Sequence, residues 1–196
     1  MTQTRPTITS VNGTENEQLL KERLLNLFDR YPLNKWLYTE QVQIEARVIP
    51  HSHPILTLIP QTRGADYLAD SARLLGTYIH EQLHWFLQLE STFEAYKNAS
   101  SELRSLYPDL PTERPEGCGS DRSNYLHIQV NYLEYRALRE LLGEAEARMV
   151  IERVPYYTAI YALVLRDYGQ IGKLMTKYRL IPNEQPPELK RFVATA

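Results

Sequence analysis

Apolar residues recur at helical spacing along most of the chain, so the pattern predicts a protein built mainly of helices. The first such stretch runs from about Glu15 to Phe28 and is followed by Asp29-Arg30-Tyr31-Pro32, a sequence that ends a helix. The longest stretch lies near the middle of the chain. We expect helices over about 15–28, 66–89, 91–106, 123–142, 143–153 and 155–178, the last with a break near Gly169 or Gly172.

One region has the pattern of β-strands instead. Polar and apolar residues alternate through Gln41–Glu45, and a second short apolar run, Ile55–Ile59, ends at Pro60. The turn sequence Pro50-His51-Ser52-His53-Pro54 lies between them and predicts a small β-hairpin or sheet. We interpret His51 and His53 as turn histidines without a function, because alternate residues of a strand point to opposite faces.

These elements predict an α+β fold that is mostly helical: a small sheet, a central helix and a C-terminal helical lobe. We expect one domain over residues 1–196, with sub-lobes at about 15–106 and 123–181. The segment 107–122 is rich in proline and glycine and is the predicted linker between them. Residues 1–14 are polar and predict a frayed terminus, and the tail from Pro182 is expected to be extended.

Composition and charge exclude several classes of protein. The chain has 22 basic and 24 acidic side chains and a net charge of −2, so it lacks the general attraction for nucleic acid or anionic membranes. No apolar stretch approaches the ~18–20 residues that cross a bilayer, and the polar start does not resemble a signal peptide. The single cysteine, Cys118, excludes an intramolecular disulfide and a cysteine-rich zinc site. We therefore expect a cytoplasmic protein that binds neither nucleic acid nor membrane, and the sequence does not indicate its oligomeric state.

The chemistry lies in the central helical stretch, which contains His80-Glu81-Gln82-Leu83-His84, a complete HExxH motif. Histidines four residues apart lie on one face of a helix, with Cβ atoms about 5–6 Å apart. Both imidazoles can then bind one zinc ion at nitrogen–metal distances of roughly 2.0–2.1 Å. Glu81 lies on the flank of the same face, where its carboxylate can accept a proton from a metal-bound water and pass it to a leaving amine.

This motif and the order of strands before the helix resemble the zincin metallopeptidases. The resemblance implies a small twisted sheet, an active-site helix and a third metal ligand from a later segment. The pattern HExxHxxGxxH of the metzincin branch is absent, because Leu87 and Glu90 occupy the positions of its glycine and third histidine. Zincins commonly bind substrate along the edge strand beside the active-site helix, so the resemblance implies that Ile55–Ile59 binds substrate through its backbone.

A catalytic zinc site needs a third protein ligand and an open position for water. The best source is the helix predicted after residue 122, where His127, Asn131 and Glu134 form a polar stripe at spacing i, i+4 and i+7. Resemblance to the gluzincins, in which a later helix supplies a glutamate, implies Glu134 as the ligand. Because Leu138 stands where many gluzincins continue with the aspartate of an ExxxD element, His127 stays open as the third ligand or as a substrate-binding residue.

We therefore predict a zinc-dependent hydrolase, in the first place a peptidase acting on a peptide or protein substrate. His80, His84 and Glu134 would hold Zn²⁺, and Glu81 would be the general base. A tyrosine hydroxyl near the metal could stabilise an oxyanion, and Tyr157, at the start of the last long helix, is a candidate for this role.

Two alternatives are kept beside this prediction. The first is a non-catalytic regulatory or binding protein that holds a structural metal on a zincin-like fold. The second is a di-iron site of the helical-bundle type, which would use Glu-x-x-His on two helices. Glu81 and His84 supply one copy of that pattern, but no other glutamate lies three residues before a histidine.

Overall fold

A computed structural model describes residues 5–62 and 64–182 of the chain. Within these residues it contains seven α-helices and a three-stranded parallel sheet, which confirms the predicted α+β class with helix dominant. None of the helices in that part of the chain is long and apolar enough to cross a bilayer. The tail that we expect to be extended lies beyond Pro182, outside the described residues.

The chain divides into two compact units, and the boundary falls between Trp85 and Phe86. The second unit runs Phe86–Ile181, so the proline-rich segment 107–122 lies inside it and does not separate the two units as the predicted sub-lobes required. The boundary lies within the helix α2 (Ser71–Leu87), which carries the HExxH motif.

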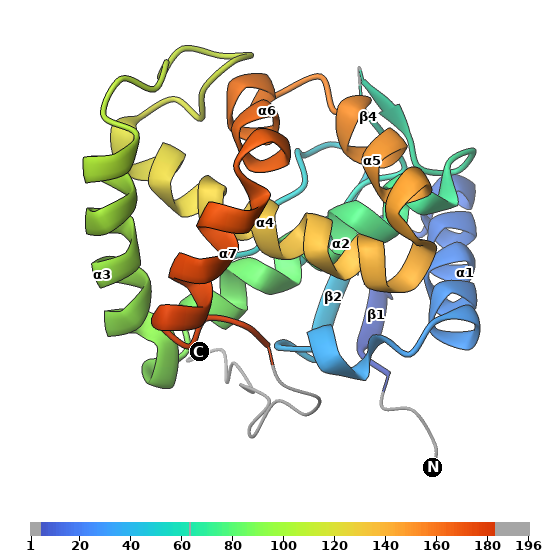
Figure 1. The fold of residues 1–196 in the computed structure, drawn as a ribbon. Helices are drawn as coiled ribbons and strands as arrows, with labels where there is room; N and C mark the ends of the chain where they lie inside the picture. The colour runs from blue at the N-terminus through green and yellow to red at the C-terminus, as the bar shows by residue number, and fades with distance from the viewer. Residues whose placement is uncertain (1–4, 63, 183–196) are drawn as a thin grey trace. The chain divides into compact units, whose positions relative to one another are not determined.

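The first unit contains a parallel sheet in the order β1-β2-β3. Strand β1 (Thr7–Ser10) leads into α1 (Glu15–Arg30), which packs on β1 and on the next strand, β2 (Gln41–Ile44) (Figure 1). Strand β1 corrects the prediction of a frayed terminus, because its residues pair in register with β2. Ile8 is its one buried apolar residue, so the short strand carries too little apolar pattern to be detected.

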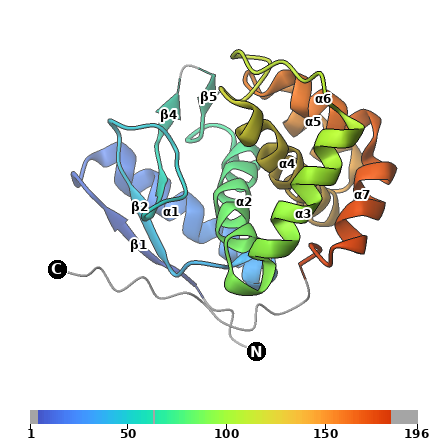
Figure 2. The ribbon, with the colours of Figure 1, turned by 90° about the vertical axis from the view of Figure 1, so that its left-hand side faces the viewer.

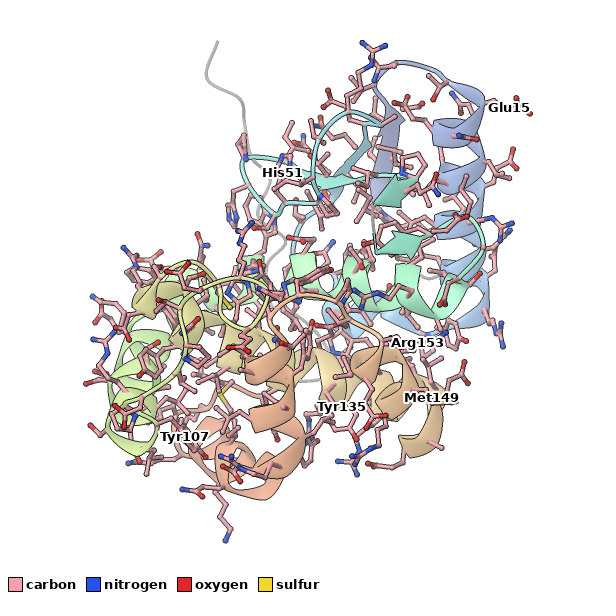
Figure 3. All side chains as sticks on the ribbon, turned by 90° about the horizontal axis from the view of Figure 1, so that it is seen from above. Glu15, His51, Tyr107, Tyr135, Met149 and Arg153 are labelled. Atoms are coloured by element: carbon pink, nitrogen blue, oxygen red, sulfur yellow. The ribbon has the colours of Figure 1, made fainter. Side chains whose placement is uncertain are left out.

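Of the predicted hairpin or sheet, the sheet is confirmed and the hairpin is wrong, because β3 (Leu56–Leu58) lies parallel to β2. The connection of residues 45–55 is therefore a wide loop that returns to the start of the sheet (Figure 2), and Figure 3 labels His51 within it. Alternation and turn residues predict strands but do not distinguish parallel from antiparallel pairing.

The loop also covers part of the edge of β3. The His51 N–H donates to the Thr57 carbonyl at 3.1 Å, and the Thr57 N–H donates to the His51 carbonyl at 2.8 Å. These are the backbone groups of Thr57 that point away from β2. The predicted substrate-binding edge Ile55–Ile59 is therefore wrong at Thr57, where the protein's own loop occupies it.

The rest of the first unit leads to α2. A short 3-10 helix (Leu33–Trp36) precedes β2, and β4 (Gln61–Thr62) pairs with β5 (Ala65–Asp66) in a second, antiparallel sheet. The side chain of Asp70 accepts a hydrogen bond from the Arg73 N–H at 2.9 Å and so caps the start of α2. The helix begins later than its apolar pattern suggests because β5 and this cap precede it.

The second unit is helical and is built around one central helix. Helix α4 (Asp121–Leu142) packs against the four others of this unit (Figure 1): α3 (Glu90–Leu106), α5 (Glu144–Glu152), α6 (Thr158–Arg166) and α7 (Tyr168–Lys177). The predicted break in the last long helix is confirmed, although it lies at Asp167, slightly before the two glycines.

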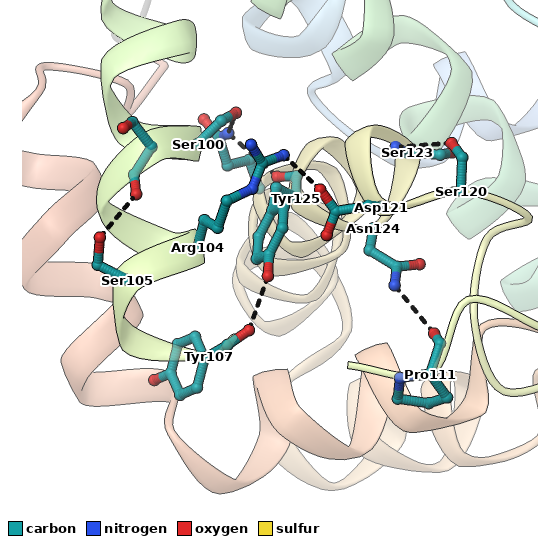
Figure 4. A network of polar contacts seen from close by, with 12 residues as sticks. Ser100, Arg104, Ser105, Tyr107, Pro111, Ser120, Asp121, Ser123, Asn124 and Tyr125 are labelled. Atoms are coloured by element: carbon teal, nitrogen blue, oxygen red, sulfur yellow. Dashed lines mark hydrogen bonds and ion pairs between the residues drawn. The ribbon is translucent and has the colours of Figure 1, made fainter. Parts of the chain in front are cut away.

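Hydrogen bonds explain why the proline-rich segment belongs to this unit. The Tyr125 hydroxyl donates to the Tyr107 carbonyl at 2.8 Å, and the Asn124 amide donates to the Pro111 carbonyl at 2.9 Å (Figure 4). Further along, the Pro115 and Glu116 carbonyls accept hydrogen bonds from the first two N–H groups of α6, both at 3.1 Å. The segment therefore ties the start of α4 to the start of α6.

Candidate functional site

The glutamine inside the HExxH motif fixes the orientation of α2. Gln82 is fully buried, and its Oε1 accepts hydrogen bonds from the N–H groups of Tyr38 (2.7 Å) and Thr39 (2.9 Å). Its Nε2 donates to the Thr39 carbonyl (3.1 Å) and to the Tyr78 hydroxyl (2.9 Å). Gln82 lies about half a helical turn from His80, so these bonds turn the two histidines of the motif toward the opposite face.

On that face, the structure brings His80 and His84 together. Their Nε2 atoms are 3.3 Å apart, and their rings meet edge to face at 5.0 Å between centroids. Each residue is 8% exposed, and Glu81 between them in sequence is 7% exposed. The motif is thus nearly enclosed, with two imidazole nitrogens directed at each other and a carboxylate on the next helix position.

The loop after β2 attaches to the same helix through Trp85. The Trp85 indole N–H donates to the Ser52 carbonyl at 2.7 Å, and the His53 ring stacks on the indole with centroids 4.1 Å apart and planes at 22°. Burial lowers the pKa of His53. The sequence pattern indicated no function for His53, and no sequence signal revealed that the loop returns to α2.

In the second unit, His127 has a defined ring orientation. Its Nδ1 lies 2.8 Å from the Ser123 carbonyl, which can only accept, so Nδ1 carries the proton. In the neutral ring the lone pair is then on Nε2. A metal-binding histidine is commonly held this way, with one ring nitrogen donating to a carbonyl and the other directed at the metal.

Tyr157, the candidate for oxyanion stabilisation, lies beside His127. The two rings are 4.4 Å apart between centroids and tilted by 52°. Tyr157 has a left-handed backbone, with φ 57° and ψ 32°, a conformation that costs a bulky side chain roughly 1–2 kcal/mol. Strain of this kind clusters at functional sites, and here it holds the Tyr157 ring against a candidate ligand.

The predicted polar stripe on α4 is buried along its length. Glu134 is 1% exposed, and its Oε2 accepts a hydrogen bond from the Tyr161 hydroxyl at 2.8 Å. Asn131 is fully buried, and within residues 5–62 and 64–182 neither atom of its amide has a hydrogen-bond partner. A buried polar group without a partner costs about 1–3 kcal/mol, so the Asn131 amide lowers the free energy of unfolding.

Comparison with known proteins gives no further guidance: no protein family, no curated protein and no solved structure matches the chain. The site has to be interpreted from its own chemistry.

Proposed function

We propose that this chain is a zinc-dependent hydrolase that cleaves peptide bonds. His80, His84 and His127 would hold the metal, and Glu81 would act as general base and then as general acid. The cytoplasmic location expected from the sequence stays a prediction, as does the resemblance to the zincins.

The observation that carries the proposal is the 3.3 Å separation between the Nε2 atoms of His80 and His84. A direct hydrogen bond would be long at this distance, since N–H donors in proteins most often lie about 2.9–3.0 Å from their acceptors. Two nitrogen ligands of one tetrahedral zinc ion, each about 2.0–2.1 Å from the metal, are roughly 3.3–3.4 Å apart. The pair therefore fits a shared metal ion better than a hydrogen bond between the rings.

We propose His127 as the third ligand, in place of the Glu134 that the sequence favoured. His127 is the candidate that the sequence left open beside Glu134, and like His80 and His84 it is buried. The hydrogen bond from Nδ1 of His127 to Ser123 puts the lone pair on the other ring nitrogen. Glu134 lies about 10.5 Å further along the axis of α4, and its carboxylate is bonded to Tyr161.

The remaining residues have separate tasks in the proposed reaction. When bound, the metal ion would polarise the substrate carbonyl and lower the pKa of a water molecule. Glu81 accepts a proton from the attacking water on its carboxylate and returns it to the nitrogen of the leaving amine. Tyr157 is the candidate donor to the oxyanion, because its ring lies against His127.

Metal analysis of the purified protein, prepared without chelators, is the first test. We expect about one equivalent of zinc, and less than about a tenth of an equivalent after His80→Ala or His127→Ala, because three ligands are needed for tight binding. His51→Ala is the matched control, since its side chain bonds to the Ile49 carbonyl. If Glu134→Gln loses the metal and His127→Ala retains it, the ligand set proposed here is wrong.

Catalysis is tested separately, with a mixture of fluorogenic peptides as substrate. Glu81→Gln should retain zinc and lose hydrolysis by about 10²-fold or more, because the glutamine cannot accept the proton. A folded wild-type protein that holds zinc but cleaves no peptide would contradict the hydrolase and support the alternative of a structural metal.

A further inference from the structure

We propose that His53 is a substrate-binding residue, which donates a hydrogen bond to the substrate backbone on the Glu81 side of the metal site. This inference rests on the proposed function, and it adds a binding residue from the loop between β2 and β3.

Glu81 and Trp85 lie on the same side of α2. Successive residues of an α-helix are about 100° apart, so His80 and His84 lie within about 40° of each other and Glu81 lies about 60° beyond His84. Trp85 is a further 40° in the same direction and one turn along from Glu81, so their Cβ atoms are about 5–6 Å apart. A group held on Trp85 is therefore on the flank of the helix where Glu81 would act.

His53 is held on this flank by its own ring and by contacts of the two residues before it in the loop. Its ring stacks on Trp85 with centroids 4.1 Å apart, and the preceding carbonyl, of Ser52, accepts the indole N–H at 2.7 Å. Two residues earlier, His51 pairs with the backbone of β3 at Thr57. The loop is thus fixed to the sheet and to α2, and a fixed donor loses little entropy when it binds a ligand.

The hydrogen bond of the His53 ring to Ser52 allows the other ring nitrogen, Nε2, to be a donor. Nδ1 of His53 lies 2.8 Å from the Ser52 hydroxyl, and if that hydroxyl donates, the ring proton is on Nε2. In the part of the chain that the structure describes, Nε2 has no hydrogen-bond partner, and the residue is half-buried rather than enclosed. Burial lowers the pKa of His53, so the ring is neutral at neutral pH and can keep this tautomer.

The test uses two hydroxamates that bind the metal through the same group and differ in whether they also carry a peptide backbone. Acetohydroxamate binds the metal alone, whereas a dipeptide hydroxamate also offers backbone carbonyls to the protein. We expect His53→Ala to weaken the dipeptide hydroxamate about tenfold, the usual effect of one hydrogen bond, and to leave acetohydroxamate unchanged. Affinities are measured by absorption on the cobalt-loaded protein, with metal content measured on the same samples.

Three variants make the result specific. His51→Ala, in the same loop, should change neither affinity. His53→Gln should recover part of the lost affinity, because the glutamine amide can donate from a similar position. Trp85→Phe should lose an intermediate amount of affinity for the dipeptide hydroxamate, because it removes the indole N–H that holds Ser52.

The outcomes separate this inference from the function on which it rests. If the wild-type protein binds cobalt and both probes but His53→Ala binds them equally well, the role of His53 is wrong and the metal site stands. If the folded wild-type protein binds no metal, both proposals fail, and the metal content shows this directly. Equal loss of both probes in His53→Ala would show damage to the metal site and would also overturn the inference.

Discussion

Each unit of this protein contains a central helix with a fully buried glutamine, and the two glutamines are bonded differently. Gln82 in α2 uses both amide atoms, in four hydrogen bonds. Gln129 in α4 donates from Nε2 to the Tyr96 and Tyr125 carbonyls and to the Ser100 hydroxyl, but its Oε1 has no partner among the described residues.

The same contrast extends along the two helices. In the first unit, the glutamine of the motif is tied to backbone groups that precede β2, and the two histidines of the motif contact each other. In the second unit, Asn131 lies between His127 and Glu134 with neither amide atom bonded within the described part of the chain. In the first unit, hydrogen bonds therefore fix the glutamine of the motif, whereas the second unit keeps the amides of Gln129 and Asn131 incompletely bonded in its core, at a cost in stability.

The largest expected effect is that of Gln82→Leu. Leucine has a similar size but leaves the N–H groups of Tyr38 and Thr39 buried without their acceptor, and we expect the free energy of unfolding to fall by about 3–5 kcal/mol. Gln129→Leu is the matched control and should cost about half as much, because one of its amide atoms is already without a partner. Urea unfolding followed by circular dichroism measures both, and equal losses would show that the two glutamines do not differ in this way.

A second prediction concerns Glu17, a buried carboxylate of the first unit. It accepts hydrogen bonds from Ser10, from the backbone and side chain of Asn12 and from the Ala46 N–H, at 2.9–3.0 Å. Burial alone would raise the pKa of Glu17, but these bonds outweigh it and lower the pKa to about 2. Because the folded pKa is below the ordinary value of 4.5, the carboxylate stabilises the protein above about pH 4.5, and this is lost as the pH falls toward 2.

The variant Glu17→Gln should therefore lose roughly 2–3 kcal/mol of stability at pH 7, and the difference from the wild type should shrink as the pH falls from 4.5 toward 2. Glu15→Gln, at the exposed start of the same helix (Figure 3), is the control and should change stability by less than about 0.5 kcal/mol. Urea unfolding at several pH values gives the comparison. A Glu17→Gln loss that stays constant down to pH 2.5 would contradict the role given to the carboxylate.

The sequence predicted what depends on local pattern and missed what depends on the path of the chain. The helices, the cap sequence after Phe28 and the polar stripe from His127 to Glu134 follow from spacing of a few residues. Strand β1 was missed because only Ile8 faces the core, and parallel pairing was missed because alternation is the same in either direction. The contact between His53 and Trp85 depends on where a long loop returns, which no local pattern encodes.

The smallest expected effect has the opposite sign and comes from two asparagines of α4, both fully buried. Both amide atoms of Asn124 are hydrogen-bonded: Oδ1 accepts from the Cys118 N–H at 2.8 Å, and Nδ2 donates to the Pro111 carbonyl at 2.9 Å. Neither amide atom of Asn131 has a partner within the described residues. Asn131→Leu keeps the number and branching of the side-chain heavy atoms and removes the unpaired polar group, so we expect it to raise the free energy of unfolding by about 1 kcal/mol.

Asn124→Leu should instead lower the free energy of unfolding, by about 1–3 kcal/mol, because it leaves the Pro111 carbonyl (Figure 4) and the Cys118 N–H unpaired. If the polar stripe serves the proposed hydrolysis, the stabilised Asn131→Leu protein should also cleave peptides more slowly while it retains its zinc, which is the usual exchange of activity for stability at a functional site. Thermal unfolding and the peptide assay on the same preparation decide both points. An Asn131→Leu protein that is less stable than the wild type would mean that the amide is satisfied, and the contrast drawn between the two helices would then be lost.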